Sequence, residues 1–595
     1  MLSADNVALS DLSCVKSVAS EVVSYWSNRL CEQLADPSGA KAYYKHLLQV
    51  ATNYEQWAEA ATMLDDLEGH DAWKQEPRSP DYDWELIQAK LNQLRDVRQT
   101  TQSQSAMIFA LRTSLARNLG DMGNPKQLYS HSRSGTKTLI LSYIDEVVRQ
   151  LNWICDEPSS EPELDLRAKL EFFTTIRQSF GRTALLLSGG GTLGLNHFGV
   201  IRCLHRARLL PRIISGASSG SIVAAMVCTK TSDEIPKMFD PSAFKLDVFE
   251  RAEQPDTPLM RIHRLLSKGQ LYDLEILQDA MRSNIGDITF QEAFNRTRWI
   301  LNITVSSSTV YDQPRLLNYL TAPDVLIWSA VAVSCSVPVF YGSSALYAKD
   351  KNGNIVPWNP TDQLYIDGSV DNDLPMNKLS ELFNVNHFIV CQVNPHVIPF
   401  LQRSSTPSRA RRATNFCMRL AKSEIQHRCT QLTELGIAPS FFNKIQSIIS
   451  QKYSGDITII PEVGCSDFLK VLSNPSFRTV MEAINRGERA TWPKMSIIRN
   501  HLQIELTIDA ILYRLRLRRL SELPHSLPAN GNGNAPSSRP VMETRAASHL
   551  DVPRISTLPA PIEFSATQST PISYMSDREK ASSRRGLAMT APDKK

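Results

Sequence analysis

The chain has 595 residues, 42% of them hydrophobic, a length that allows two to four domains with large buried cores. Its net charge of +4 is too small to argue for nucleic acid as a partner. The ten cysteines form no C-x-x-C pair, and the first residues carry an acid without an apolar run. We therefore expect a reduced, intracellular protein without a secretory signal.

The first 180 residues are predicted to be helical. Within an N-terminal segment, residues 1–50, apolar side chains at 15–34 recur near helical spacing. This pattern favours an amphipathic helix that docks on the protein, with a membrane surface as the alternative. A helical domain is expected over residues 50–180, with helices at 54–67, 84–98, 106–119 and 137–153. The acidic, proline-containing stretch 156–163 predicts a linker.

A glycine loop follows the apolar strand 185–187. Its sequence, Ser188-Gly189-Gly190-Gly191-Thr192-Leu193-Gly194, lets the backbone bring its N–H groups close to a ligand. The loop fits the dinucleotide pattern G-x-G-x-x-G, but the next strand ends without a ribose-binding carboxylate. A phosphate loop would need Gly-Lys-Ser/Thr. An oxyanion hole needs only two converging N–H groups, so this reading remains.

Ser218 lies at the centre of Gly216-Ala217-Ser218-Ser219-Gly220, between the apolar runs 210–214 and 222–227. This arrangement predicts a strand, a tight turn and a helix, with the hydroxyl exposed at the helix N-terminus. The pentapeptide alone is equally compatible with a Gly/Ser-rich turn.

Residues 325–348 carry no charge, which superficially satisfies the length of a membrane span. Because the stretch contains Pro338, Gly342 and several Ser or Cys residues, we expect a buried helix and a loop instead. Shortly after it, the apolar run 364–366 ends in Asp367-Gly368-Ser369. Asp-Gly alone is usually a turn, but beside the two earlier motifs Asp367 becomes a candidate general base.

The remaining chain is predicted to add a strand and further helices. Residues 403–412 read as a flexible basic connector, residues 456–461 as a strand, and residues 501–520 as a last helix that ends in alternating Arg and Leu. The Arg/Leu end, residues 514–520, is a second segment that could adsorb on an anionic surface, although a solvated helix face explains it equally well. Residues 521–595 are rich in Pro, Ser and Asn and are predicted to be a disordered tail.

In this order, the glycine loop, the serine elbow and the later Asp-Gly resemble the patatin-like phospholipase family. Flanking segments, among them residues 194–200, 373–376, 381–390 and 486–493, are similar to its fungal and plant triacylglycerol lipase branch. Segments between residues 57 and 119 resemble the helical domain that precedes the lipase domain in that branch. The resemblance covers most of residues 50–515. It departs in one place, since the family usually has Asp-Gly-Gly or Asp-Gly-Ala where this chain has Asp-Gly-Ser.

The resemblance implies an α/β fold: a three-layer α/β/α patatin-like domain over residues 183–395, with a mainly parallel sheet. A helical domain precedes it, and a C-terminal helical extension, residues 396–520, and the disordered tail follow. Ser218 is the implied nucleophile and Asp367 its proton acceptor, in a dyad without histidine. The implied supporting positions are the oxyanion loop, the elbow and the third motif: Gly189, Gly190, Gly191, Gly194, Gly216, Gly220 and Gly368.

A triad in which Asp367 orients His387 or His396 stays open as the alternative to the dyad. The implied activity is that of a serine lipid acyl hydrolase, foremost a triacylglycerol lipase working through an acyl-enzyme. A phospholipase, a lysophospholipid hydrolase or an acyltransferase would use the same residues. An inactive lipid-droplet scaffold is the alternative of a different class. No metal or other cofactor is expected, protein partners are unknown, and the substrate would be lipid at a droplet or membrane surface.

Overall fold

The computed structural model describes residues 37–522, with gaps at 102, 125–127, 159–163, 241–244, 246, 252–256, 269, 308–314, 338–339, 360–363, 370–372, 396, 398–408, 437–450 and 452. The chain divides into two compact units, Met1–Pro524 and His525–Lys595, and every described residue belongs to the first. The predicted amphipathic segment 15–34, the predicted tail beyond Glu522 and His396 therefore lie outside the described residues.

The first region is helical, as the sequence predicts. Its helices are α2 (Pro37–Val50), α3 (Tyr54–Leu67), α4 (His70–Gln75), α5 (Trp84–Asp96), α6 (Gln104–Ser114), α7 (Thr138–Asp156) and α8 (Leu166–Phe180). Four of them begin at a side chain that accepts a hydrogen bond from a first-turn amide, which satisfies an otherwise unpaired N–H: Asn53, Asp83, Ser103 and Asp165.

The structure differs from the prediction at α6 and at α8. α6 ends at Ser114 rather than Leu119, because Leu115 turns to an extended conformation that leads Arg117 inward. α8 was not predicted as a helix. Its apolar residues Phe172, Phe173, Ile176 and Phe180 are buried in one core with α5, α6 and α7.

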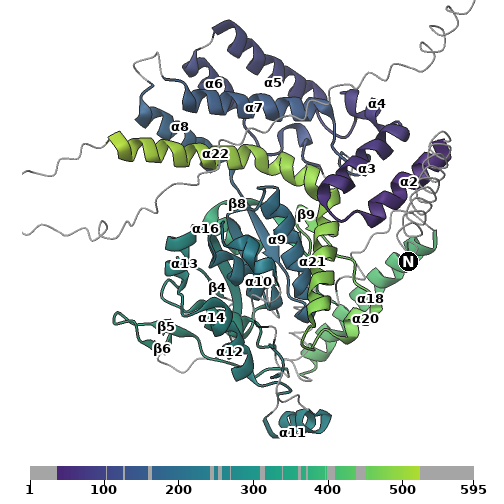
Figure 1. Ribbon diagram of the computed structural model, residues 1–595, viewed down its shortest axis with the longest axis vertical. Coiled ribbons are helices and arrows are strands. Elements are labelled where there is room, and N and C mark those ends of the chain that lie inside the picture. Colours follow the sequence, from purple (N-terminus) through teal and green to yellow (C-terminus); the bar gives the residue numbers. More distant parts are fainter. Residues whose placement is uncertain are drawn as a thin grey trace, which may run out of the picture. The chain divides into compact units, whose positions relative to one another are not determined.

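The last helix, α22 (Met495–Glu522), begins six residues before the predicted start and joins two cores. Ile497, Ile498 and Leu502 belong to the core of the sheet region. The following apolar residues belong to the core of the helical region: Ile504, Ile508, Ile511, Leu512 and Leu515. Figure 1 shows this helix lying along α7 and α8.

The second region is built on a seven-stranded sheet. The strands are β1 (Arg182–Leu187), β2 (Ile213–Gly216), β3 (Ile300–Ser307), β4 (Arg315–Leu317), β7 (Tyr365–Asp367), β8 (Val385–Cys391) and β9 (Ile457–Ile459). Their order is β4-β3-β2-β1-β8-β9, with β7 also pairing with β3. The four pairings from β3 to β9 are parallel, and β4 and β7 are antiparallel. A two-stranded hairpin, β5 (Tyr347–Lys349) and β6 (Ile355–Pro357), lies apart from this sheet.

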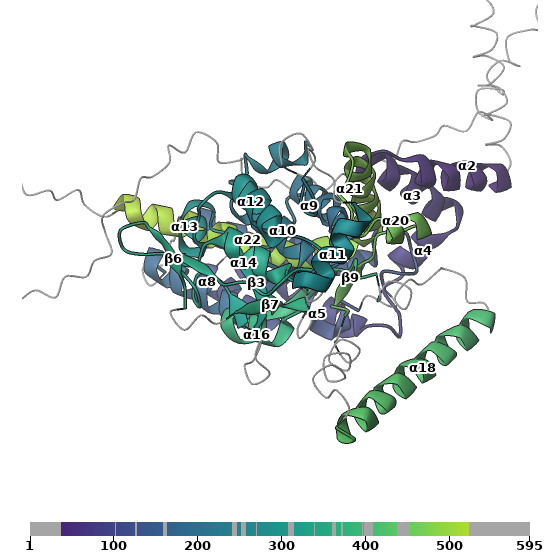
Figure 2. The same ribbon diagram turned by 90° about the horizontal axis from the view of Figure 1, so that it is seen from below.

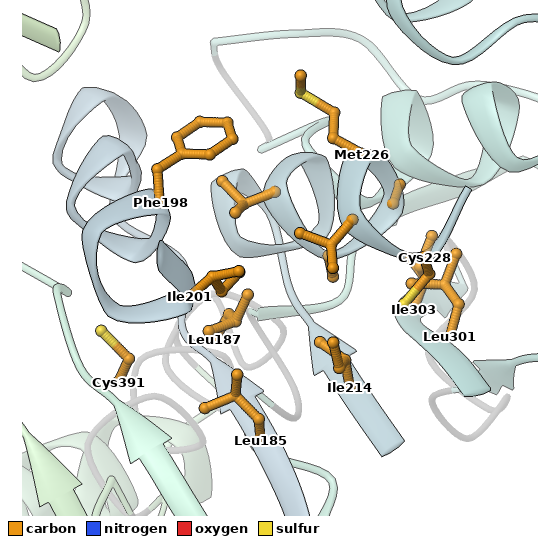
Figure 3. Close-up of a cluster of buried hydrophobic side chains, with 14 of the residues drawn as sticks. Leu185, Leu187, Phe198, Ile201, Ile214, Met226, Cys228, Leu301, Ile303 and Cys391 are labelled. Atoms are coloured by element: carbon orange, nitrogen blue, oxygen red, sulfur yellow. The ribbon is translucent and has the colours of Figure 1, made fainter. Parts of the chain in front are cut away.

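Helices cover both faces of the sheet, because successive strand side chains point to opposite sides. Leu185 and Leu187 of β1 share a core with α9 (Asn196–Arg206), α10 (Ser219–Cys228) and α14 (Ile327–Ser334). Figure 3 shows Leu187 next to Ile201 of α9, with Phe198 and Met226 farther from the strands. The alternate residues Ala184 and Leu186 pack with α16 (Met376–Phe383). The predicted α/β fold with a mainly parallel sheet is confirmed.

Further helices complete the region: α11 (Pro258–Lys268), α12 (Leu274–Ile285), α13 (Phe290–Thr297), α18 (Arg409–Glu434), α20 (Cys465–Leu469) and α21 (Phe477–Thr491). Residues 409–412 belong to α18, so that part of the predicted flexible connector is wrong, whereas residues 403–408 lie outside the described residues. In the uncharged stretch 325–348, α14 is buried throughout. None of the helices among the described residues is both long and apolar enough to span a membrane.

Two glycines hold α21 close against α9, directly behind the predicted oxyanion loop. A Cβ on Gly199 would lie 1.9 Å from the Ile484 carbonyl oxygen, and one on Gly487 would lie 2.0 Å from that of Asn196. Neither position has room for a side chain. This backbone contact fixes the first turns of α9, the helix that continues from the loop.

Candidate active site

Ser218 stands in a strained turn between β2 and α10. Its φ of 49° and ψ of −126° lie in a region that residues other than glycine rarely occupy. The turn closes tightly because a Cβ at Gly216 would lie 2.4 Å from the Gly220 carbonyl oxygen, and one at Gly220 would lie 2.2 Å from that of Leu187. The sequence Gly-x-Ser-x-Gly thus supplies the two positions where a side chain cannot fit.

The strained backbone is held by a hydrogen bond from inside the sheet region. The Ser218 amide donates to the Ser334 hydroxyl oxygen at 3.0 Å, and that hydroxyl donates to the Thr304 carbonyl at 2.8 Å. α14 and β3 therefore hold the turn through these two hydrogen bonds. The side chain of Ser218 remains 9% exposed and lines a cavity.

The four glycines of the predicted oxyanion loop play different structural parts. The amides of Gly190 and Gly191 have no hydrogen-bond acceptor among the described residues, whereas the Gly189 amide already donates to Asp373 Oδ1 at 3.0 Å. Gly194 gives space, since a Cβ there would meet the Ser219 hydroxyl oxygen at 2.5 Å. Gly190 and Gly191 are thus the two positions whose N–H groups are available to a ligand.

Gly191 needs to be glycine for two reasons. Its φ of +58° is left-handed, and a Cβ would lie 2.6 Å from the Val471 carbonyl oxygen. The same carbonyl accepts the Thr192 amide at 2.9 Å, which fixes the loop against the segment before α21. Gly189 in turn brings the loop to the serine, because a Cβ there would lie 3.2 Å from Ser218 Cβ.

Asp367 ends β7 and is completely buried. Burial raises its pKa to about 6, although hydrogen bonding from Ser369, whose amide donates at 2.7 Å, and from the Ser218 side chain works in the opposite direction. Oδ2 of Asp367 has no hydrogen-bond partner of ordinary length within the described part of the chain. The Ser218 side chain is thus near enough to influence the pKa of Asp367, and catalytic hydrogen bonds often tighten only when substrate binds.

The position after Asp367 also excludes a side chain. A Cβ on Gly368 would lie 2.2 Å from the Thr304 carbonyl oxygen of β3. The Asp367 amide donates to the Ser336 carbonyl at 3.1 Å, directly after α14. Asp367 and Ser218 are thus both anchored to β3 and to the end of α14.

A second buried carboxyl, Asp373, was not predicted as a site residue. Its Oδ1 accepts the Gly189 amide at 3.0 Å, and its Oδ2 accepts the Asn394 side-chain amide at 2.7 Å. Burial, together with the nearby Asp367 charge, raises its pKa to about 7 against the opposing effect of the hydrogen bonds from Gly189 and Asn394. The sequence signal was the segment Asp373-Leu374-Pro375, which supported only the family resemblance.

His387, the candidate triad base, lies at the other end of the strands. It pairs with Thr183 near the start of β1, four residues and about 13 Å before the loop that follows Leu187. Its Nδ1 lies 3.2 Å from the Thr183 hydroxyl, and its ring stacks on His501 with 4.4 Å between centroids. Burial lowers its pKa well below the ordinary value.

His197 supports the loop instead of reaching the serine. It is completely buried, its Nε2 lies 2.9 Å from the Ser188 carbonyl oxygen, and burial lowers its pKa to about 4. Groups of three or more His, Cys, Asp or Glu side chains arranged to hold a metal ion are absent from the described ranges. The site therefore brings together a serine, a carboxyl and two backbone donors.

The cavity above Ser218 has a volume of about 360 Å³ and is mostly apolar. Gly190, Gly191 and Ser218 form one end of its wall. Its apolar lining comes from α9, α10, α12 and the segments beside them: Leu195, Phe198, Ile222, Val223, Met226, Val248, Phe249, Leu277, Met281, Val337, Phe340, Tyr341, Val471 and Leu472. Such a surface suits a hydrocarbon chain better than a sugar or a nucleotide.

Comparison with known proteins gives two family matches. Residues 35–178 match a domain of unknown function, DUF3336, and residues 185–379 match the patatin-like phospholipase family. The chain is 43% identical over 484 residues to triacylglycerol lipase 4 of Saccharomyces cerevisiae, covering 78% of this chain and 52% of that one. It is 39% identical over 481 residues to triacylglycerol lipase ptl3 of Schizosaccharomyces pombe, covering 80% of this chain and 98% of that one.

A plant relative is also similar. The chain is 38% identical over 507 residues to triacylglycerol lipase SDP1L of Arabidopsis thaliana, covering 82% of this chain and 61% of that one. The chain thus spans about half to three fifths of the budding yeast and plant relatives and nearly all of the fission yeast one.

Proposed function

Because this chain belongs to the patatin-like phospholipase family, we propose that it is a serine hydrolase that cleaves the ester bonds of triacylglycerol. One observation carries the proposal: the Ser218 hydroxyl lies beside the buried Asp367 carboxyl and opens on an apolar cavity. Similarity to triacylglycerol lipases over most of the chain supports the choice of substrate.

In the proposed reaction, Ser218 Oγ attacks the ester carbonyl and Asp367 accepts its proton. The N–H groups of Gly190 and Gly191 stabilise the oxyanion, a contribution of about 3 kcal/mol per donor. The leaving glyceride oxygen takes the proton from Asp367, and the acyl group remains on Ser218. Water then hydrolyses the acyl-enzyme, with Asp367 again accepting a proton.

Asp373 acts as a positioning residue in this proposal. By holding the Gly189 amide it leaves the next two amides to the oxyanion. It also places a second carboxyl near Asp367, and two buried carboxyls in one site resist ionising together. The pair therefore favours a state with one proton, in which Asp367 can serve as the base.

Triacylglycerol is insoluble in water, so the proposed reaction takes place at the surface of a lipid droplet or a membrane. The apolar cavity takes one acyl chain, and the uncharged glyceride needs no charged group to hold it. The same cavity would accept the acyl chain of a phospholipid. Substrate preference is therefore the point that the experiment must decide.

The test is incubation of the purified full chain with emulsified triacylglycerol, diacylglycerol and phospholipid. We expect fatty acid release to be fastest from triacylglycerol. Ser218→Ala should abolish release and labelling by a fluorophosphonate, while the matched variant Ser219→Ala keeps both. Preferred release from phospholipid would replace the proposed substrate, and continued labelling of Ser218→Ala would replace the proposed nucleophile.

A further inference from the structure

We propose that α11 seats the catalytic region on an anionic phospholipid layer, with its apolar face inserted among the lipid chains. The proposal rests on the proposed function only in expecting a lipid surface at the site. α11 projects from the lower end of the catalytic region in Figure 1 and faces the viewer in Figure 2, which is seen from below.

The outer face of α11 is apolar and exposed to solvent. Leu259, Ile262 and Leu266 are 79%, 53% and 82% exposed. Their spacing of three and four residues puts them on one side of the helix. Met260, on the flank, is 54% exposed. An isolated exposed leucine needs no explanation, but a continuous face of this kind marks a binding surface.

The inner face of the same helix carries Arg261 and Arg264 beside the half-buried Leu265, and the contacts that hold it are largely polar, which is unusual for a surface helix. Arg261 pairs with Glu250 at 2.9 Å and lies over the Tyr272 ring, 5.5 Å from its centroid. Arg264 donates to the Leu271 carbonyl at 3.0 Å. A helix that packs on its own protein normally turns its apolar side inward. In α11 the side with Arg261 and Arg264 contacts the protein, and the side with Leu259, Ile262 and Leu266 faces outward.

The charge of α11 selects the kind of surface. The helix contains no acidic residue and carries Arg261, His263, Arg264 and Lys268. An amphipathic helix with basic residues beside a leucine-rich face is the type that lies in the boundary of a phospholipid layer. Arg261 and Arg264, although bound to the protein on the inner face, are only half-buried. Their remaining exposed surface is available to anionic headgroups, an attraction that salt weakens.

α11 is also connected to the wall of the cavity. Tyr272, beneath Arg261, packs on Phe249 and on Tyr341 with ring centroids 5.4 Å and 5.7 Å apart. Both of these rings line the cavity above Ser218. A lipid layer bound to α11 therefore lies next to the aromatic wall of the cavity.

The first experiment measures flotation of the full chain with phosphatidylcholine vesicles that contain phosphatidylserine. All variants carry Ser218→Ala, so that the vesicles are not consumed. Replacing Leu259, Ile262 and Leu266 by Ser should lower the bound fraction at least tenfold. The matched control is Phe109→Ser, which removes a side chain that is 68% exposed on α6 and should leave binding unchanged. Unchanged binding of the triple variant, or an equal loss in the control, would overturn the proposal.

A second measurement does not depend on removing the apolar side chains of α11. In Ile262→Trp the new indole should shift its fluorescence to shorter wavelength when anionic vesicles are added, and less so in high salt. An unshifted spectrum would contradict insertion, whereas a shift with a second protein alone would point to a protein partner.

With the catalytic serine restored, the triple Ser variant should hydrolyse a soluble short-chain ester at the unmodified rate and lose activity only on emulsions. If the unmodified chain binds vesicles but hydrolyses no ester, the proposed function fails while the role of α11 stands.

Discussion

Two buried carboxylates show how differently the two regions of this molecule use charge. Asp367 lies beside Ser218 with no cation among its partners, and its pKa is raised to about 6. Glu505 of α22 is nearly as deeply buried, yet its pKa is lowered. Burial alone pushes both pKa values upward, so the difference comes from the partners.

Glu505 is surrounded by donors. Arg117 and Arg177 pair with its two oxygens at 2.9 Å and 3.1 Å, and Thr183 of β1 donates its amide at 3.0 Å and its hydroxyl at 2.6 Å. These partners come from the helical region and the sheet, and Glu505 itself lies on α22. Together they hold the charge in place, and a fixed charge of this kind joins structural elements.

Asp367 has the opposite arrangement and therefore the opposite chemistry. A carboxylate that is poorly stabilised as an anion takes up a proton readily, which is what a general base must do. The same lack of partners makes the folded state less stable at neutral pH. The molecule thus keeps one buried carboxylate satisfied for stability and leaves another unsatisfied at its candidate active site.

The sharpest test of this contrast is Asp367→Asn. We expect kcat/KM on emulsified triacylglycerol to fall by about four orders of magnitude, because the base is lost. The free energy of unfolding should nevertheless rise by up to about 3 kcal/mol at pH 8, the value of a two-unit pKa shift. Urea unfolding checks the second effect. A variant that is both inactive and destabilised would show that the Asp367 charge, like that of Glu505, stabilises the fold.

Glu505→Gln should give the reverse result. Removing one charge leaves Arg117 and Arg177 partly unpaired, and breaking such a buried network costs about 3–5 kcal/mol. We expect lower stability in urea but a near-normal rate per folded molecule with a soluble ester. A large loss of rate at full stability would mean that the network reaches the chemistry.

The two carboxylates should also respond oppositely to pH. Activity requires ionised Asp367, so kcat/KM should decrease tenfold per unit below about pH 6. Because the folded pKa of Asp367 is raised, its contribution to stability is present below the unfolded pKa and is lost as pH rises through about 6. Glu505 has a lowered pKa, so its contribution is present above the unfolded pKa and is lost as pH falls.

Asp373→Asn refines the pH measurement. Removing a carboxyl that faces Asp367 should move the acid limb of activity to lower pH by a few tenths of a unit. The Gly189 amide keeps an acceptor in the asparagine oxygen, so the loop should hold its position. An acid limb that stays in place would show that the two carboxyls titrate independently.

The smallest effect is expected from His387→Gln. His387 lies on β8, where it pairs with Thr183 at the start of β1, far from Ser218. The rate should therefore stay within about threefold of the unmodified chain. Fluorophosphonate labelling and ester hydrolysis check this expectation. A loss of several orders of magnitude in a folded variant would restore the triad.

Local patterns predicted much of the fold and the candidate site. Gly216 and Gly220 can be read from the sequence because a tight turn needs glycine whatever surrounds it. The alternation of apolar strands and helices likewise predicted a mainly parallel sheet. The family resemblance added Asp367, which an Asp-Gly turn alone would not have distinguished.

What could not be predicted depends on distant contacts. Asp373 is important because Gly189 and Asn394 meet it, and no spacing reports that meeting. The Arg/Leu end of the last helix is exposed at Arg516, Arg519 and Leu520, as a surface segment would be. Leu515, however, is completely buried, and Arg514 pairs with Asp156 at 2.9 Å. In α11 the sequence shows an amphipathic helix, but only the structure shows that its apolar side faces outward.

Because α22 contributes residues to both cores, its position near the end of the chain affects folding during synthesis. The core of the helical region includes apolar residues from Ile504 to Leu515, and the core of the sheet region includes Ile497, Ile498 and Leu502. Neither region can bury its apolar surface until the ribosome has released nearly the last described residue. During synthesis α7 and α8 therefore leave the ribosome with an apolar groove uncovered, which exposes the nascent chain to aggregation. A fragment that stops at residue 379, where the family match ends, lacks α22. The apolar surfaces that α22 covers in the two cores would therefore stay exposed.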